Sequence, residues 1–346
     1  MSKNYLVTGG SGYFGEILVK KLLSLNNKVR VIDINNLSFT HDNLEFIYCD
    51  ISKIKKEDEK KIFSNIDIIH HNAAVLPIEN DKKRFWDVNS IGTNNVINLA
   101  ISYNIKKFIY VSSASIFAKS KIIEIDEKTT PNPIENYGAS KLDGENLLVN
   151  YKNKIDIVII RPRTVVGNGR YGLFQIIFEW TFKGYKIPLL NKGKNIFQFI
   201  HCDDLVEFCL LAETLKGYEI FNIGTDKICS IKDIIEGLIK HANSKSKVIY
   251  FPNIASSIIE LTSKFKLSPI NKWHISAMTK DQYFNTQKAK DLLGWVPKYG
   301  NIEMICESYD HYTKDRTKIL KQNTGSVHKK KLKKGILKIL EFFLKF

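Results

Sequence analysis

The sequence predicts an α/β protein in which a doubly wound parallel sheet carries helices on both faces and is followed by a smaller, mostly helical lobe. The first half of the chain alternates short apolar runs with helical patterns, which is typical of parallel strands joined by helices. Runs such as 66–70 are almost continuously apolar, as expected for strands covered on both faces. A glycine-rich turn between the first apolar run and the first helical pattern is also typical of this fold class.

The elements follow in a regular order. Six apolar runs predict the strands of the sheet: Tyr5–Thr8, Val29–Asp33, Glu45–Tyr48, Ile66–His70, Lys107–Ser112 and Ile155–Arg161. Periodic apolar positions predict the helices: Gly12–Leu25, Lys83–Tyr103, Tyr137–Asn150, Leu173–Lys183 and Asp203–Thr214. A further run, Tyr218–Ile223, is expected to return to the main sheet, and Asp203 and Asp204 are expected to cap the helix that they open.

Three parts are expected along the chain. The 346 residues suit one large domain or two interlocked ones, at about 150 residues per domain. Residues 1–165 should form the sheet domain, to which 200–225 returns, and residues 166–323 the smaller lobe. Residues 324–346 differ in composition and are expected to form a basic amphipathic tail.

The net charge of +16 raises the question of a nucleic-acid partner. Only six of the 52 basic residues are arginines, the side chains best suited to forked contacts with phosphates and base edges. The lysine excess accompanies abundant isoleucine and asparagine, which favours a compositional bias over a binding surface. We therefore predict no nucleic-acid partner.

The five cysteines form no CxxC pair and no metal-ligand spacing. They are expected to be small core residues of a protein in a reducing compartment, and the histidines likewise show no HxH or HExxH pattern. No apolar run is long enough for a signal peptide or a membrane-spanning helix. The sequence predicts a cytoplasmic protein that holds no metal.

The glycine-rich turn has the pattern of a dinucleotide site. Gly9, Gly12 and Gly15 permit a tight turn, a close approach of backbone to a pyrophosphate, and tight packing of helix on strand. The helix that begins beside Tyr13 and Phe14 would point its free N–H groups at the phosphates. Asp33 follows Gly15 by 18 residues, which suits a carboxylate that binds the adenosine ribose and repels a 2′-phosphate. The predicted cofactor is NAD.

Three polar residues could perform acid–base chemistry. Tyr137 and Lys141 are four residues apart and so share one face of a helix. A neighbouring ammonium group stabilises a phenolate, which can then accept a proton near neutral pH. Ser113 follows the strand 107–112 and could bind the same substrate oxygen. At this spacing alone, an exposed pair on the surface of a helix is the alternative interpretation of Tyr137 and Lys141.

Together these motifs resemble the extended short-chain dehydrogenase/reductase family, in its NAD-dependent epimerase/dehydratase branch, over about residues 4–320. The matching segments are Thr8–Gly15, Asp33, Cys49–Ile51, His71–Ala74, Val88–Thr93, Ser112–Ala114, Tyr137–Lys141, Arg161–Pro162, Phe199–Asp204 and Leu293–Trp295. The resemblance implies a Rossmann-type fold and a homodimer formed by the helices 83–103 and 137–150.

The resemblance implies that Ser113, Tyr137 and Lys141 are catalytic, and it implies roles for further residues. Asp50 and Ile51 would flank the adenine, and Ala73 and Ala74 would line the cofactor. Asn89 would lie behind the active site, and Ser112 would adjoin the cofactor. For Asn89 and Ser112, a hydrogen bond inside the core is an equally good interpretation.

The resemblance implies that the substrate is a sugar whose hydroxyl group is oxidised and then reduced again. Nucleotide-sugar members of the family commonly hold the diphosphate with an asparagine and an arginine, where this chain has Thr164 and Phe197. Three of the six arginines nevertheless lie within 161–170. The first hypothesis is therefore an epimerase or dehydratase whose Arg163 and Arg170 bind a nucleotide-sugar or a lipid-linked sugar diphosphate.

A second hypothesis is a dehydrogenase or reductase of a hydrophobic alcohol or ketone, which resembles the 3β-hydroxysteroid dehydrogenase branch. Phe174, Phe178, Phe197 and Phe199 would then line an apolar pocket, although aromatic side chains at this spacing are more often core residues.

The segment 329–346 contains seven lysines and one glutamate, a net charge of +6. On a helix, its apolar and lysine-rich positions would lie on opposite faces, as in helices that rest on anionic membranes. The alternative is a helix that packs on the protein's own surface or on a partner subunit. The expected location is cytoplasmic, with peripheral contact at the inner face of the membrane.

Overall fold

The computed structural model describes residues 2–76, 81–167, 169, 171–251, 280–321 and 344. Its central sheet has seven parallel strands in the order β12-β7-β5-β4-β1-β2-β3. Their bounds are β1 (Asn4–Thr8), β2 (Lys28–Asp33), β3 (Leu44–Tyr48), β4 (Ile68–His71), β5 (Lys107–Val111), β7 (Asp156–Pro162) and β12 (Tyr218–Ile223). The predicted doubly wound parallel sheet is therefore present, and each predicted strand lies within two residues of its expected bounds.

The strand order reverses between β1 and β4. From β1 the chain builds outward to β2 and β3, whereas β4, β5, β7 and β12 extend the sheet on the other side. Thr8, the last residue of β1, is opposite His71, the last residue of β4. Ligands of open α/β sheets bind at the carboxyl ends of the strands at such a switch point, which here is the Thr8–His71 edge.

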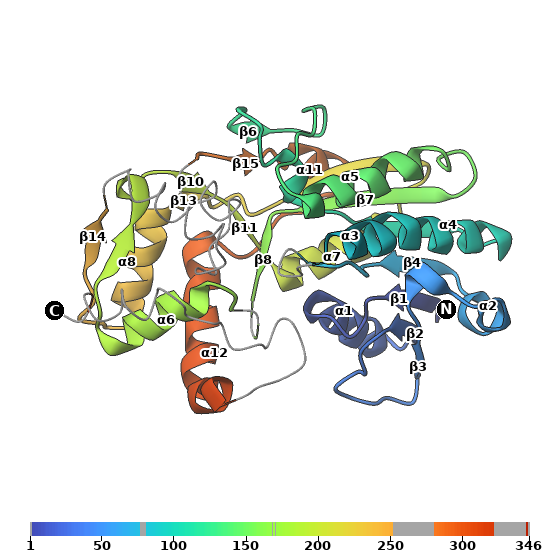
Figure 1. Ribbon diagram of the computed structural model, residues 1–346, viewed down its shortest axis with the longest axis horizontal. Helices are drawn as coiled ribbons and strands as arrows, with labels where there is room; N and C mark the ends of the chain where they lie inside the picture. The colour runs from blue at the N-terminus through green and yellow to red at the C-terminus, as the bar shows by residue number, and fades with distance from the viewer. Residues whose placement is uncertain are drawn as a thin grey trace.

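Helices cover both faces of the sheet (Figure 1). On one face, α1 and α7 contribute Leu18, Leu22 and Phe208 to a core that also contains Val7. On the opposite face, α2, α4 and α5 pack over Leu6 and its neighbours. The helix bounds are α1 (Tyr13–Ser24), α2 (Lys56–Phe63), α4 (Thr93–Ser102), α5 (Asn136–Val149), α7 (Cys202–Ala212) and α11 (Gln287–Leu293). Successive residues of β1 thus face different cores, which explains why the strand sequences are apolar throughout.

The helix predicted over 83–103 has an irregular centre. It consists of α3 (Lys82–Trp86), the π-helical turn η2 (Asp87–Gly92) and then α4. A Cβ atom on Gly92 would lie 2.8 Å from the Ile51 side chain, so this turn is pressed against the loop after β3. The predicted helical segment is therefore present, and its irregular centre is a feature that periodicity does not reveal.

A second lobe contains α6 (Phe174–Lys183), α8 (Ile231–His241) and α12 (Asn301–Lys321), which Figure 1 shows grouped apart from the sheet. Short strand pairs join them: β8 (Thr164–Val166) with β11 (Phe199–His201), β9 (Ile187–Leu189) with β14 (Val248–Tyr250), and β10 (Ile196–Phe197) with β13 (Cys229–Ser230). Strands of two or three residues are too short to show alternation in the sequence. A fourth pair, β6 (Glu124–Ile125) with β15 (Tyr283–Phe284), lies beside the sheet domain.

One residue of the predicted tail is described. Leu344 is 2% exposed and belongs to an apolar cluster with Trp180, Ile187 and Leu189. Its carbonyl oxygen accepts a hydrogen bond from the Lys186 amide at 3.0 Å. The other residues of the segment 324–346 lie outside the described residues. Within the described part of the chain, no helix is long and apolar enough to cross a membrane.

Candidate active site

The glycine-rich turn joins β1 to α1 at the switch point. Gly9 has a φ of 69°, and a Cβ atom on it would lie 2.6 Å from the Ala73 amide nitrogen. A Cβ atom on Gly15 would lie 2.2 Å from the Gly9 carbonyl oxygen, and one on Gly12 would lie 3.2 Å from the same oxygen. Gly9 and Gly15 therefore stand where a side chain would strain or break the turn, whereas a methyl group at Gly12 would make only a tight contact.

The first turn of α1 leaves its N–H groups available. Gly12 is the N-cap residue and supplies no side-chain hydrogen bond. Phe14 packs against the core beneath the helix. Tyr13 turns its hydroxyl toward Cys202, with Gly167 packed against both. An uncapped helix N-terminus after a glycine turn is the arrangement that binds a pyrophosphate.

The two acidic residues near this turn stand at the ends of β2 and β3. Asp33 accepts hydrogen bonds from the amides of Ser11 at 3.0 Å and Asn35 at 2.9 Å, which fixes its carboxylate beside the glycine turn. Asp50 caps the 3₁₀ turn η1 (Ile51–Lys53) by accepting from the Ser52 amide at 2.9 Å. Ile51 is 4% exposed beneath it.

Ala73 and Ala74 follow β4 and form the other side of the switch point. The Ala73 amide donates to Thr8 Oγ1 at 3.1 Å, so the two loops are joined directly. The side-chain amide of neighbouring Asn72 is buried and finds no hydrogen-bond partner among the described residues. An unpaired buried amide is costly, and a polar ligand in this position would satisfy it.

Tyr137 and Lys141 lie one turn apart in α5. Lys141 is 1% exposed, and its Nζ lies 4.0 Å from the centre of the Tyr110 ring. Burial lowers the pKa of Lys141 to about 7, although Glu145 acts in the opposite direction. Lys141 Nζ has no hydrogen-bond partner within the described part of the chain. These residues, together with the unpaired Asn72 and the glycine turn, fit a bound dinucleotide.

Ser113 lies against the same helix. It caps the 3₁₀ turn η3 (Ala114–Phe117), accepting from the Ser115 amide at 3.2 Å and the Ser115 hydroxyl at 3.0 Å. A Cβ atom on Gly138 would lie 2.6 Å from the Ser115 carbonyl oxygen, so α5 packs tightly on this turn beside Tyr137. Ser112 is buried, and its hydroxyl lacks a partner among the residues that the structure describes.

Asn89 points inward from the π-helical turn. Its side chain accepts from the Val75 amide at 2.8 Å and donates to Ser140 Oγ at 2.9 Å. No sequence pattern assigned a role to Ser140. A serine between Tyr137 and Lys141 in the motif was a signal that could have suggested one.

A buried ion pair joins α5, the helix of Lys141, to β7. Arg161 on β7 donates to Glu145 on α5 through Nε at 3.1 Å and through Nη2 at 2.6 Å, and both side chains are under 5% exposed. Glu145 lies one turn beyond Lys141 and supplies the negative charge nearest to it. The sequence marked Arg161 as part of a family motif, but nothing identified Glu145 as its partner.

The predicted substrate residues do not all share one environment. Arg163 is 5% exposed, and its guanidinium donates to the Gln282 carbonyl oxygen at 3.0 Å and to its side chain at 3.2 Å. It also packs over the rings of Phe197 and Phe284. These internal contacts favour a structural role for Arg163. Thr164 opens β8 and is partly exposed, whereas Arg170 lies outside the described residues.

The four phenylalanines of the proposed apolar pocket pack on one another. Phe197 and Phe199 have ring centres 4.9 Å apart, and Phe174 contacts both Phe199 and Phe178. Phe178, Phe197 and Phe199 are each at most 5% exposed. This arrangement is a lobe core, so the core interpretation of these rings is the one the structure favours.

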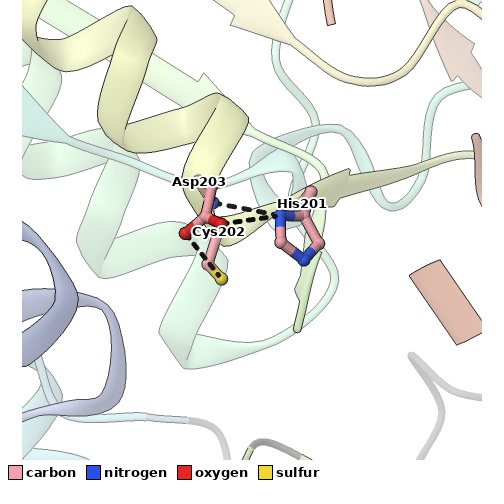
Figure 2. Close-up of side chains that lie close together, drawn as sticks. All are labelled: His201, Cys202 and Asp203. Atoms are coloured by element: carbon pink, nitrogen blue, oxygen red, sulfur yellow. Dashed lines mark hydrogen bonds and ion pairs between the residues drawn. The ribbon is translucent and has the colours of Figure 1, made fainter. Parts of the chain in front are cut away.

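His201, Cys202 and Asp203 come close enough together to suggest a metal site (Figure 2). The Asp203 amide, however, donates to His201 Nδ1 at 3.2 Å, which uses the lone pair that a metal would need. Burial raises the pKa of Cys202 to about 12, as expected for a small core thiol. The group therefore works as the N-terminal cap of α7.

Asp203 and Asp204 were expected to cap this helix, and His201 does so instead. Asp204 is buried and accepts from the amides of Lys298 at 3.1 Å and Tyr299 at 3.2 Å. It thereby fastens the loop before α12 to the sheet domain.

The chain matches known proteins over most of its length. The model of the NAD dependent epimerase/dehydratase family matches residues 5–224. A protein of Sinorhizobium fredii described as uncharacterized is 38% identical over 99% of this chain and 87% of its own length. A putative UDP-glucose 4-epimerase of Methanocaldococcus jannaschii is 30% identical over 68% of this chain and 81% of its own length.

Two further comparisons differ in what they suggest. The sterol-4-alpha-carboxylate 3-dehydrogenase of Bos taurus is 25% identical over 86% of this chain and 88% of its own length. The solved structure of UDP-glucose 4-epimerase from Thermotoga maritima with UDP-glucose is 24% identical, with a TM-score of 0.75, over 90% of this chain and 99% of that one. The chain is therefore an enzyme with a Rossmann-type fold and NAD as its cofactor, and it belongs to the NAD-dependent epimerase/dehydratase family.

Proposed function

We propose that the enzyme is an epimerase or dehydratase that acts on a hydroxyl or keto centre of a nucleotide-sugar or a lipid-linked sugar. The observation that carries this proposal is the placement of Tyr137 and Lys141 one turn apart on α5, packed against the turn that Ser113 caps. These residues provide a base, a buried cation and a hydroxyl group at the carboxyl edge of the sheet.

Each residue has a distinct task in this proposal. Tyr137 accepts the proton of the substrate hydroxyl and later returns it. Lys141, held in a dry environment, stabilises the phenolate of Tyr137. Ser113 donates a hydrogen bond to the same substrate oxygen. NAD supplies a hydride acceptor and donor at the carbon that bears this oxygen.

A sugar substrate is favoured by the relatives that are named for one. A putative UDP-glucose 4-epimerase is 30% identical to this chain, and the Thermotoga maritima structure has the same fold with UDP-glucose bound. Thr164 and Phe197 replace the residues that commonly hold the diphosphate in the family, and Arg163 is engaged with Gln282. We therefore propose that Thr164 and Arg170 contact the phosphates. Arg163 would have a structural role through its hydrogen bonds to Gln282.

A panel of sugars tests the proposal. UDP-glucose, UDP-galactose, UDP-glucuronic acid and dTDP-glucose would each be incubated with the enzyme and substoichiometric NAD, and the products followed by proton NMR. Conversion of at least one sugar with NAD recycled is expected. Tyr137→Phe should lower turnover by roughly 10²–10⁴-fold while leaving NAD affinity unchanged. If no sugar turns over or perturbs bound NAD, the sugar assignment is wrong.

The second candidate is a dehydrogenase of a hydrophobic alcohol. The observation that favours it is the 25% identity to a sterol-4-alpha-carboxylate 3-dehydrogenase over 86% of this chain. Stoichiometric formation of NADH with a hydrophobic 3-hydroxy compound, measured at the NADH absorption band, would select this function. Turnover with catalytic NAD selects the epimerase.

We also propose that the enzyme forms a homodimer through the helices at 82–102 and 136–149. Trp86 and Ile91 are 39% and 50% exposed on this surface, so two large apolar side chains are available there for a partner to cover. Light scattering should give twice the monomer mass for the wild type and a lower mass for Ile91→Lys. An unchanged mass in the variant would place the interface elsewhere.

A further inference from the structure

His71 occupies a central position between the cofactor turn and the catalytic helix. It ends β4, is fully buried, and has a hydroxyl group on each side of its ring. Its Nδ1 lies 2.8 Å from Thr8 Oγ1, and its Nε2 lies 3.0 Å from Thr93 Oγ1. The proposed reaction makes no use of this residue.

The neighbouring hydrogen bonds fix the direction of each contact. Thr8 Oγ1 accepts from the Ala73 amide, so its own proton is free to donate to His71 Nδ1. Thr93 Oγ1 donates to the Asn89 carbonyl oxygen at 2.8 Å, so it accepts the proton on His71 Nε2. The ring is therefore a neutral Nε2–H tautomer. Burial, with a smaller contribution from Lys141, lowers the pKa of His71 to about 3 and keeps the ring neutral at working pH.

The contacts continue from both sides of the ring. On one side, Thr8 leads into Gly9 and the cofactor turn. On the other side, Thr93 holds Asn89 in the π-helical turn, and the Asn89 amide donates to Ser140 Oγ. Ser140 Oγ in turn donates to the Tyr137 carbonyl oxygen at 2.9 Å. A series of hydrogen bonds, continued through the covalent frame of Asn89, thus joins Thr8, next to the cofactor turn, to the backbone carbonyl oxygen of Tyr137.

Packing alone does not explain a histidine here. The ring stacks on Tyr110 at 5.7 Å between centres, a contact that an apolar aromatic ring would also make. A phenylalanine would remove one hydrogen bond from each of the two threonine hydroxyls, and the buried site excludes the water that could replace it. The two directed hydrogen bonds are what only histidine supplies.

We propose that His71 is a positioning residue that couples NAD binding at the glycine-rich turn to the placement of the α5 segment that carries Tyr137 and Lys141. This coupling depends on the family cofactor and not on the identity of the substrate. It can therefore be tested independently of the proposed function.

Two substitutions interrupt the series at opposite sides of the ring. In His71→Asn, the side-chain oxygen can still accept from Thr8, but no atom reaches Thr93. In His71→Gln, the longer side chain can still donate to Thr93, but the contact with Thr8 is lost. Thr93→Val removes the same contact as His71→Asn from the other partner, together with the hydrogen bond from Thr93 Oγ1 to the Asn89 carbonyl oxygen, and Thr93→Ser retains both.

Two readouts avoid the need for a substrate. The dissociation constant for NAD would be measured by calorimetry, and the protection that NAD confers on the 137–141 amides by hydrogen–deuterium exchange. His71→Gln should weaken NAD binding about tenfold, the effect of one buried hydrogen bond. His71→Asn should bind NAD within about twofold of the wild type but lose its effect on the 137–141 amides.

A double-mutant cycle provides the control. His71→Asn with Thr93→Val should alter 137–141 protection no more than Thr93→Val alone, because Thr93→Val already removes the contact that His71→Asn loses, and Thr93→Ser should behave as the wild type. The Thr93 variants carry the test if a His71 variant fails to fold. The proposal is overturned if all variants lower thermal stability equally while NAD affinity and NAD-dependent protection stay as in the wild type.

Discussion

The chemistry proposed for this enzyme depends on single residues. Their spacing can be read from the sequence, whereas their surroundings depend on tertiary contacts. The four-residue spacing of Tyr137 and Lys141 is enough to place both side chains on one face of a helix. The burial of Lys141 depends on Tyr110 from β5, which is remote in sequence. The lowered pKa of Lys141 could therefore not be predicted from the motif.

Lys141 should make stability depend on pH. Its pKa is lowered from 10.5 to about 7 in the folded enzyme, so between about pH 7 and 10.5 the unfolded chain binds more protons. The contribution of this group to the free energy of unfolding should therefore rise with pH across that window. Urea denaturation of the cofactor-free enzyme at pH 6–10 measures it. Lys141→Met should flatten the rise, whereas Lys20→Met, on the exposed face of α1, should not.

The glycine turn should tolerate substitutions in a defined order. Gly15→Ala places a Cβ atom 2.2 Å from the Gly9 carbonyl oxygen, a backbone atom that cannot move aside, whereas Gly12→Ala places one at 3.2 Å. Gly15→Ala should therefore lower the melting temperature and abolish NAD binding. Gly12→Ala should fold normally and bind NAD more weakly. Equal effects of the two substitutions on NAD affinity would contradict this interpretation of the turn.

At the scale of elements, the bounds of the strands could be predicted closely, whereas the irregular turn inside the helical segment 82–102 could not. Strand bounds followed from apolar runs because both faces of the sheet are covered. The π-helical turn at 87–92 is set by contacts of Asn89 with Val75 and Ser140, which come from other elements. The short strands of the lobe likewise depend on partners distant in the sequence.

The ion pair between α5 and β7 should be essential for the position of the catalytic helix. Removing one partner leaves a buried charge without its counterion, so Glu145→Gln should cost roughly 3–5 kcal/mol of unfolding free energy. The double variant Glu145→Leu with Arg161→Met should recover part of that loss, because no charge remains buried. Chemical denaturation of the wild type and of both variants tests this. A smaller loss in Glu145→Gln than in the double variant would refute it.

At the scale of the whole molecule, the charge of +16 divides between an enzyme body and a basic carboxy-terminal segment. Leu344 packs against Trp180 and Ile187 of the lobe, so this residue contacts the protein itself. The lysines of the segment favour contact with anionic lipid. Membrane association of the segment remains a proposal.

Removal of residues 325–346 separates these two contacts. If the segment binds membranes, the full chain should cosediment with anionic vesicles in low salt and the truncated chain should not. Vesicles of neutral lipid serve as the control. Leu344→Ala should cost about 2–5 kcal/mol in the stability of the full chain, because it removes a buried leucine. Equal sedimentation of both chains would exclude a membrane role for the segment.

The sequence alone predicted the fold class, the glycine-rich turn after β1 and the placement of Tyr137 and Lys141 on one helix, because each rests on local patterns: apolar runs, a glycine turn and a four-residue spacing. Tertiary structure decided what surrounds them. It joined Glu145 to Arg161, turned Arg163 inward to Gln282, replaced Asp203 by His201 as a helix cap, and placed His71 between two threonines. The physical reason is that these contacts join residues from separate elements, and local patterns carry no record of which elements will meet.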